Sequence, residues 1–177
     1  MYFVPRINIY WGDFSLVKAE LILFRSAYNK SKYSYYHLIS GSDLPLRPES
    51  QIFYFFDNHR NKIFIRLAKA DKQAENRVKY RQVLIRYRQR SNSPKVINYS
   101  AKVINKIGIR VQKLLGINII KKYKIKVGIG SEWVSLDTST VKLILDNEIW
   151  IAKVFSNSVC SDELFIPTLL NKYRKLQ

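Results

Sequence analysis

The sequence predicts an α/β fold: a layered domain with a mainly parallel sheet flanked by helices, plus a basic helical segment. Over residues 7–65, short apolar runs of strand length alternate with segments whose apolar residues recur every three or four positions. Hydrophobic residues occupy 47% of the 177 positions, which is ample for a packed core. No internal repeat or low-complexity linker divides the chain, so we expect a single domain over residues 1–177, with residues 66–117 as a basic helical insertion.

The first three elements are predicted to be a strand, a helix and a second strand. Residues 7–12 form an apolar run that ends at Gly12, and Asp13 can cap a helix over residues 15–28. The second strand starts at residue 33. Its nearly continuous hydrophobicity predicts an interior position in the sheet, with both faces covered.

A polar turn with the sequence Ser-Gly-Ser-Asp follows this second strand at residues 40–43. A buried strand that ends in a glycine-containing loop with a carboxylate is one way in which open α/β sheets form ligand sites. Local chemistry alone favours the simpler interpretation that Asp43 is a turn residue. The next helix is predicted to begin near Pro48, whose missing N–H is not needed in a first turn, and to end at residues 57–59.

The middle of the chain is basic. After a short strand predicted at residues 63–65, residues 66–90 and 95–117 are predicted to be helical, with a break between them at 91–94, Ser-Asn-Ser-Pro. Residues 121–127 alternate charged and apolar side chains, which predicts a half-exposed strand.

The C-terminal third is predicted to be mainly helical. Residues 128–137 form a second polar, glycine-rich connection, after which Asp137 or Thr138 can cap a helix that runs to residue 145. Ser161 can cap the last helix. Asp162 and Glu163 then fall in its first turn, where the helix dipole favours their charged forms.

The formal net charge of +18 favours anionic partners: nucleic acid, acidic lipid headgroups or phosphorylated substrates. The single cysteine, Cys160, excludes an internal disulfide framework and fits a reducing compartment. No transmembrane helix is predicted, because no run of about 18 uncharged apolar residues occurs. We expect a cytoplasmic protein that lies at the inner face of the membrane through residues 66–126, with a solvated helical face as the alternative role of that segment.

The sequence lacks the residues that most other catalytic mechanisms require. Two histidines, His37 and His59, and one cysteine provide no zinc-binding spacing. There is no phosphate-loop glycine signature and no Gly-x-Ser-x-Gly motif. There is also no Asp-x-Asp pair, which in many sugar transferases supplies the hard oxygen ligands that hold a divalent cation. A transferase with this sequence would therefore have to neutralise a leaving diphosphate with lysine or arginine.

Carboxylates stand at three loop or helix-start positions: Asp43, Glu132 with Asp137, and Asp162 with Glu163. Each of them, taken alone, is better explained by a structural role such as capping or interaction with the helix dipole. Trp133 lies beside glycines, where it can stack on a sugar ring or belong to the core.

Four sequence blocks combine into a more specific pattern. They are Trp-Gly-Asp-Phe-Ser-Leu-Val-Lys-Ala at 11–19, Tyr-His-Leu-Ile-Ser-Gly-Ser-Asp-Leu-Pro-Leu at 36–46, Gly-Ser-Glu-Trp-Val-Ser-Leu at 130–136 and Asp-Glu-Leu-Phe-Ile-Pro-Thr-Leu-Leu at 162–170. In this order and spacing they resemble the core-2/I-branching glycosyltransferase family, which includes β-1,6-N-acetylglucosaminyltransferases, peptide O-xylosyltransferases and bacterial relatives. The resemblance covers almost the whole chain, and the basic middle matches loosely.

This resemblance implies a GT-A-type α/β fold and an inverting, metal-independent transfer. The implied donor is a UDP-sugar of the GlcNAc or xylose type, and the implied acceptor is a hydroxyl of a glycan, a polysaccharide or a lipid-linked molecule. Glu163 matches the family's catalytic acidic residue, which implies that it is the general base that deprotonates this hydroxyl. The implied substrate-binding residues are Gly41, Ser42, Asp43, Glu132, Trp133 and Asp162.

The resemblance also implies parts that lie outside the four blocks. The family's first strand, with a His-x-Asp-like element that helps to hold the nucleotide, should precede Trp11 by several tens of residues. Its diphosphate-binding basic residues should follow the Asp-Glu block. We therefore expect the chain to be incomplete at its N-terminus and at its C-terminus. Within the chain, the diphosphate-binding candidates are Lys172, Arg174 and Lys175. Glutamine is the more usual residue of the family at the position of Glu132.

Two other functions stay open at this point. The first is a non-enzymatic nucleic-acid-binding protein that uses its charge and aromatic residues such as Tyr80, Tyr87 and Tyr99, although the sequence contains no recognised nucleic-acid motif. The second is a catalytically dead transferase remnant whose fold persists.

Overall fold

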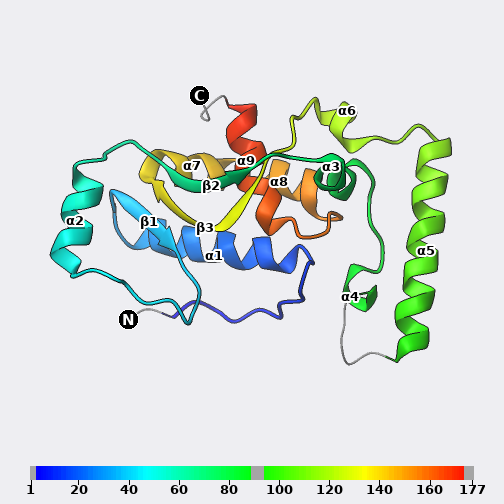
Figure 1. Cartoon of the computed structure of the whole chain (residues 1–177), viewed down its shortest axis with the longest axis horizontal. Helices are drawn as coiled ribbons and strands as arrows, with labels where there is room; N and C mark the ends of the chain where they lie inside the picture. The colour runs from blue at the N-terminus through cyan, green and yellow to red at the C-terminus, as the bar shows by residue number, and fades with distance from the viewer. Residues whose placement is uncertain (1–2, 89–93, 174–177) are drawn as a thin grey trace.

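The structure is a computed structural model that describes residues 3–88 and 94–173 (Figure 1). Its strands are β1 (Tyr35–Leu38), β2 (Phe64–Ala68) and β3 (Ile129–Asp137). Its helices are α1 (Ser15–Lys30), α2 (Glu49–Asp57), α3 (Lys72–Lys79), α4 (Ile85–Arg88), α5 (Lys95–Leu114), α6 (Ile119–Tyr123), α7 (Thr138–Asp146), α8 (Glu148–Phe155) and α9 (Asp162–Lys172).

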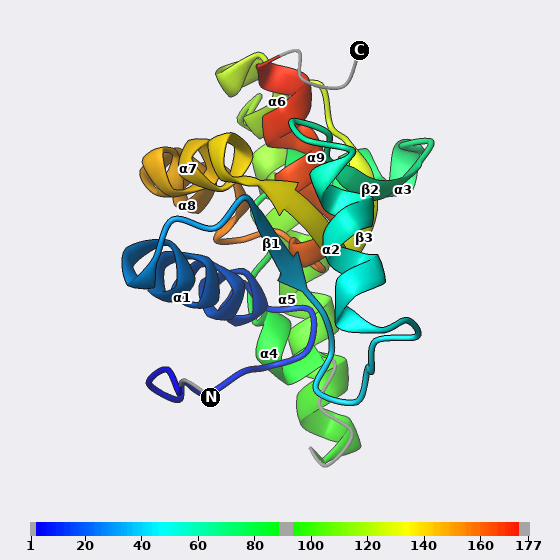
Figure 2. The same ribbon diagram turned by 90° about the vertical axis from the view of Figure 1, so that its left-hand side faces the viewer.

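The predicted α/β class is confirmed, but the predicted strand direction is wrong. The sheet of the described residues has the order β1-β3-β2, and both pairings are antiparallel, with Tyr36 opposite Leu136 and Ile65 opposite Val134. Helices α1, α7 and α8 lie on one side of this sheet and α2 on the other (Figure 2).

The strand β1 lies at an edge of this sheet and not in its interior. Its nearly continuous hydrophobicity has another cause, since helices cover both of its faces. Tyr36 and Leu38 are buried in the core, while the ring of Tyr35 packs 4.8 Å from the ring of Phe56 on α2. The central strand is β3, in which Leu136 is fully buried.

Three predicted elements differ from the observed ones. Residues 7–12 form no strand, because the backbone N–H and carbonyl of Tyr10 bond to the hydroxyl of Ser15. The half-exposed strand predicted at 121–127 is instead the end of α6 followed by an irregular segment. Buried and exposed residues do alternate there, since Ile125 and Val127 are buried between exposed lysines. This segment is nevertheless not paired as a strand in the sheet of the described residues. The predicted polar connection at 128–137 is largely the strand β3.

The predicted helices of the first and last blocks are confirmed. Helix α1 begins at Ser15, as predicted, and α9 begins directly after Ser161 with Asp162 and Glu163 in its first turn. Asp137 caps α7, since its carboxylate accepts a hydrogen bond of 3.1 Å from the backbone N–H of Thr140. The cap predicted at Ser161 has no side-chain hydrogen bond.

Helix α9 packs closely on the start of β3 because Gly128, directly before the strand, and Gly130 within it leave room for Pro167. A Cβ atom on Gly128 would lie 2.7 Å from the Cβ of Pro167, and one on Gly130 would lie 2.7 Å from the backbone oxygen of Arg66. The backbone N–H of Gly128 also donates to the hydroxyl of Thr168, at 3.0 Å. The glycines that suggested a loop therefore serve close packing, and this packing fixes the first turn of α9 relative to β3.

The basic middle of the chain forms β2 and α3 to α5. Residues 66–68 belong to β2 and not to a helix, whereas α3, α4 and α5 confirm helical structure further along. In Figure 1, α2 and α5 stand at opposite ends of the molecule. Among the described residues, no helix combines the length and the apolar character that crossing a bilayer would require.

Candidate active site

Three elements bring four carboxylates together at the N-terminal end of α9. Glu20 comes from α1, Glu132 from β3, and Asp162 and Glu163 from the first turn of α9; we call these residues the carboxylate cluster. Glu20 and Asp162 are buried, with 8% and 7% of their surface exposed. The carboxyl groups of Glu132 and Asp162 lie close enough for each to shift the pKa of the other.

A β-bulge turns Glu132 toward the cluster. Ile65 pairs with Val134 but Leu67 pairs with Gly130, so three residues of β3, 131–133, lie opposite Arg66 alone. The hydroxyl of Ser131 accepts a hydrogen bond of 3.0 Å from the backbone N–H of Trp133, which stabilises this irregularity. Bulges of this kind are common beside active sites, where they redirect a side chain.

The electrostatics of the cluster favour a shared proton. Burial raises the pKa of Glu132 to about 7, and the hydrogen bond and negative charge of Asp162 and the charge of Glu163 act in the same direction. Burial also raises the pKa of Asp162, and it raises the pKa of Glu20 well above its ordinary value. Because two carboxyl groups hydrogen-bond only when one of them is protonated, the raised pKa values of Glu132 and Asp162 favour one proton held between the two groups.

Glu163 differs from the other three members because it faces both solvent and a cation. Its side chain is 41% exposed, and its Oε2 accepts a hydrogen bond of 2.7 Å from Nη1 of Arg77 on α3. The ion pair fixes the orientation of the carboxylate. Glu163 is therefore a base that an incoming hydroxyl can reach.

The first sequence block is hydrogen-bonded to the segment directly before α9. The backbone N–H of Cys160 donates to the carbonyl of Gly12, at 3.0 Å, and Gly12 takes the positive φ of 68° that glycine accommodates easily. This hydrogen bond joins residues separated by most of the chain. It brings the Trp-Gly-Asp block next to the Asp-Glu block.

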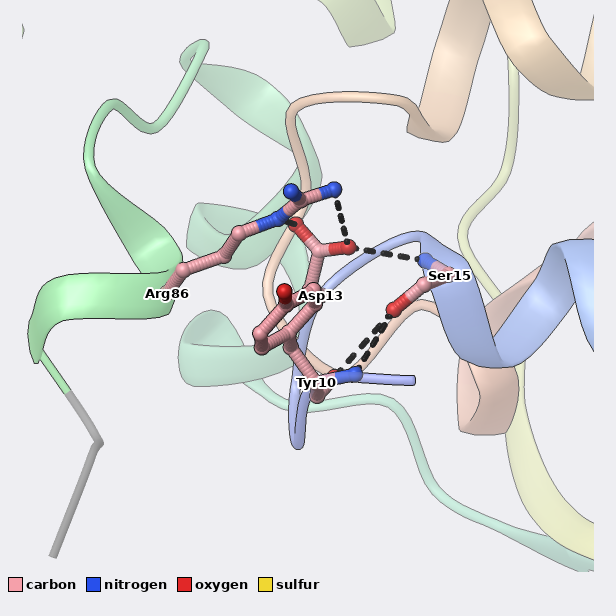
Figure 3. A network of polar contacts seen from close by, with 4 residues as sticks. All are labelled: Tyr10, Asp13, Ser15 and Arg86. Atoms are coloured by element: carbon pink, nitrogen blue, oxygen red, sulfur yellow. Dashed lines mark hydrogen bonds and ion pairs between the residues drawn. The ribbon is translucent and has the colours of Figure 1, made fainter. Parts of the chain in front are cut away.

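A polar network around Asp13 fixes this first block (Figure 3). One carboxylate oxygen of Asp13 accepts from the backbone N–H of Ser15, at 2.9 Å, and Nε of Arg86 donates to the other, at 3.2 Å. The guanidinium of Arg86 also lies 4.4 Å from the centre of the ring of Tyr10. Burial alone would raise the pKa of Asp13, but hydrogen bonds from Arg86 and Ser15 outweigh it and leave this pKa below its ordinary value.

A family model described as Core-2/I-Branching enzyme matches residues 2–177. The chain belongs to the Core-2/I-Branching enzyme family. This is a family of glycosyltransferases that use sugar nucleotides, so the chain has a sugar-nucleotide donor and a glycan acceptor as its class of substrates. A comparison with curated proteins gave no match.

The Core-2/I-Branching block that contains Asp43 forms an exposed turn. The backbone N–H of Ser40 donates to Oδ2 of Asp43, at 2.8 Å, and the hydroxyls of Ser40 and Ser42 lie 3.0 Å apart. Gly41, Ser42 and Asp43 are all exposed, and a Cβ atom on Gly41 would meet no atom within 4 Å. Asp43 thus has the contacts of a turn residue, and the substrate-binding role of this turn stays a prediction.

Trp133 lies away from the carboxylate cluster. Its side chain lines an open cavity of about 540 Å³ together with residues of β1 and β2, among them Leu38 and Arg66. Another cavity, of about 630 Å³, lies further along α9 near Pro167. Neither cavity is lined by a member of the cluster, so the structure does not unite Glu132 and Trp133 in one groove.

The structure does not bring the diphosphate-binding candidates to the cluster. Lys172 is the last residue of α9, nine positions after Glu163, which corresponds to about 14 Å along the helix axis. Its amino group lies 4.5 Å from the ring centre of Trp150. Arg174 and Lys175 lie outside the described residues. Within residues 3–88 and 94–173, no group of three or more His, Cys, Asp or Glu side chains is arranged to hold a metal ion.

Sequence reasoning missed Glu20 and Arg77. Glu20 had a detectable signal, since it follows Leu16 and precedes Phe24 by four residues each and so interrupts the apolar face of α1. Arg77 had none, because it is one of many arginines and lysines in its segment and only the packing of α3 selects it.

Proposed function

We propose that this glycosyltransferase performs an inverting, metal-independent transfer from a UDP-sugar of the GlcNAc or xylose type. The acceptor is a hydroxyl of a glycan, a polysaccharide or a lipid-linked molecule. The family match supports the transfer reaction itself. The donor, the acceptor and the independence from metal come from the sequence resemblance and are tested below.

The observation that carries the proposal is the position of Glu163. An in-line displacement needs one carboxylate that is unprotonated, accessible and placed where the acceptor hydroxyl arrives. Within the cluster, Glu20 and Asp162 are buried, and burial and the neighbouring Asp162 raise the pKa of Glu132 to about 7. Glu163 remains as the exposed member, and we assign it the role of general base.

Arg77 acts as a positioning residue in this proposal. Its hydrogen bond of 2.7 Å to Oε2 leaves the second carboxylate oxygen of Glu163 for the acceptor hydroxyl. We expect Arg77→Lys to retain more activity than Arg77→Gln, because only the lysine keeps a cation that can reach the carboxylate. If Arg77 had only a structural role, both variants would lose stability, and Arg77→Lys would not keep a higher kcat than Arg77→Gln.

The test of Glu163 is a comparison of transfer and donor binding in Glu163→Gln. We expect kcat to fall about 10²–10⁴-fold, the usual contribution of a general base, while calorimetry shows unchanged binding of the UDP-sugar. Glu49→Gln is the matched control, since Glu49 is also exposed in the first turn of a helix but lies on α2. Wild-type turnover in Glu163→Gln would reject the assignment.

The test of metal independence is transfer with and without a chelator. We expect EDTA to leave the rate unchanged, because lysine and arginine side chains would neutralise the leaving diphosphate. Activity that disappears with EDTA and returns with Mn²⁺ would contradict this part of the proposal. If the chain binds UDP but transfers no sugar from a panel of UDP-sugars, the dead-remnant hypothesis replaces the transferase proposal.

A further inference from the structure

Helix α5 attaches to the rest of the molecule through its polar and small side chains. The side-chain amide of Asn105 accepts from the backbone N–H of Val83, at 2.9 Å, and donates to Oε1 of Gln82, at 3.0 Å. The amide of Gln112 bonds to the backbone N–H and carbonyl of Arg81, each at 2.8 Å. Ordinary surface helices dock through their aliphatic face, so this arrangement leaves the aliphatic face of α5 without an internal partner.

The aliphatic face of α5 is exposed along the length of the helix. We call it the apolar stripe; its members and their exposed fractions are Val96 78%, Val103 39%, Ile107 53%, Val111 47% and Leu114 87%. At 100° per residue these positions fall within an arc of roughly 80°. In Figure 1, α5 forms the outer edge of the molecule, and no other element of the described residues lies beyond it.

A row of cations runs beside the apolar stripe. We call it the basic stripe; it consists of Lys95, Lys102, Lys106, Arg110 and Lys113. On the same helical projection the basic stripe also spans roughly 80°, and it borders the apolar stripe on the side away from the docking amides. No acidic residue occurs between Glu75 and Glu132, whereas 15 lysines and arginines do. This side of the molecule therefore presents aliphatic side chains and positive charge together.

We propose that α5 binds the surface of an anionic lipid bilayer. The helix lies in the plane of the interface, with the apolar stripe at the boundary of the acyl chains and the basic stripe among the headgroups. Interfacial helices combine these two stripes because apolar burial and attraction to anionic lipid add to each other. The long lysine side chains reach the headgroups while their methylene groups stay on the apolar side.

Charge and shape favour this partner over two others. Nucleic acid satisfies the basic stripe but leaves the apolar stripe in water, because phosphate contacts need no aliphatic surface. A second copy of the chain covers the apolar stripe but places two basic stripes near each other, where like charges repel. The inference goes beyond the proposed transfer reaction, because binding to a bilayer requires no sugar transfer.

The test is flotation of the full chain with vesicles. Phosphatidylcholine vesicles are compared with vesicles of equimolar phosphatidylcholine and phosphatidylglycerol, and we expect strong binding to the second kind only. Ile107→Ser with Leu114→Ser should weaken this binding at least about tenfold. The control is Leu46→Ser, which removes an aliphatic side chain that is 95% exposed in another part of the molecule and should change nothing.

The second arm removes charge from the basic stripe. Lys102→Gln, Lys106→Gln and Arg110→Gln together should weaken vesicle binding about 100-fold, since each cation near an anionic surface contributes about fivefold. Lys32→Gln with Lys153→Gln, both exposed and outside α5, should have a much smaller effect. The circular dichroism spectra of all variants should match that of the wild type, since these side chains are exposed.

Three results would overturn the proposal. The first is vesicle binding that the Ile107→Ser, Leu114→Ser variant retains in full, because the apolar stripe would then be irrelevant. The second is a wild-type dimer in analytical ultracentrifugation that this variant converts to a monomer, because the stripe would then be an interface between two copies. Binding to single-stranded DNA that the same variant weakens as much as vesicle binding would also count against a bilayer.

Discussion

The shared proton between Glu132 and Asp162 predicts that the folded state loses stability as the pH rises. A carboxyl group whose pKa is higher in the folded than in the unfolded chain binds more protons when folded. The stability that Glu132 contributes to the folded state is therefore fully present below the unfolded pKa of 4.5, and it is lost as the pH rises through the folded pKa of about 7. Glu132→Gln removes this titration, and its amide can still donate a hydrogen bond to Asp162.

The size of the effect follows from the pKa of Glu132. A rise from 4.5 to about 7 corresponds to about 3 kcal/mol at 1.36 kcal/mol per pKa unit. Glu132 is partly exposed, and water screens such interactions, so we expect about 1–2 kcal/mol in the free energy of unfolding. The variant should therefore become more stable relative to the wild type by this amount between pH 4.5 and pH 8.

The assay is urea unfolding at intervals of pH, with the difference between variant and wild type plotted against pH. Glu49→Gln serves as the control, because Glu49 is an exposed glutamate outside the cluster and its difference should not change over this range. A Glu132→Gln curve parallel to that of the wild type would refute the shared proton. It would mean that Glu132 is ionised at neutral pH and that its contact with Asp162 is not a hydrogen bond.

Three further predictions concern how the fold holds the site. Gly128→Ala should cost about 1–3 kcal/mol in urea unfolding, because its Cβ would lie 2.7 Å from that of Pro167, whereas Gly41→Ala should be neutral within about 0.5 kcal/mol. Asp137→Ala should cost about 1 kcal/mol through loss of the cap of α7, and Asp137→Asn should restore most of it. Asp13→Asn should be less stable than the wild type at neutral pH, and the difference should vanish as the pH falls below 3.8 through the lowered pKa of this group.

The sequence predicted those elements that depend on contacts between residues a few positions apart. The helix over residues 15–28, the helix after Pro48 and the cap at Asp137 follow from contacts within a few positions, and the structure contains all three. The direction and order of the strands follow from contacts between distant segments. The strand β3 is central because it pairs with both β1 and β2, and its approach to Pro167 needs Gly128 and Gly130, the glycines that had suggested a loop.

The same distinction applies to the site. The Asp-Glu block could be identified from its residue types and order, and the structure places both residues in the first turn of α9, as predicted. The partners of these residues could not be found in this way. Arg77 reaches Glu163 from 86 positions away, and Glu20 approaches Asp162 from another helix. Arg77 leaves no signal in the sequence, and Glu20 leaves only an interruption in the apolar face of α1, which does not identify its partner.

The basic segment is tied to the site at two points and is more than a solvated appendage. Its helix α3 contributes Arg77 to Glu163, and its helix α4 contributes Arg86 to Asp13, in the block that supports the start of α9. Helix α5 packs against α4 and is hydrogen-bonded to residues 81–83, which join α3 to α4. If α5 lies on a bilayer, the surface that binds lipid and the base that we assign to the acceptor hydroxyl belong to one connected set of helices.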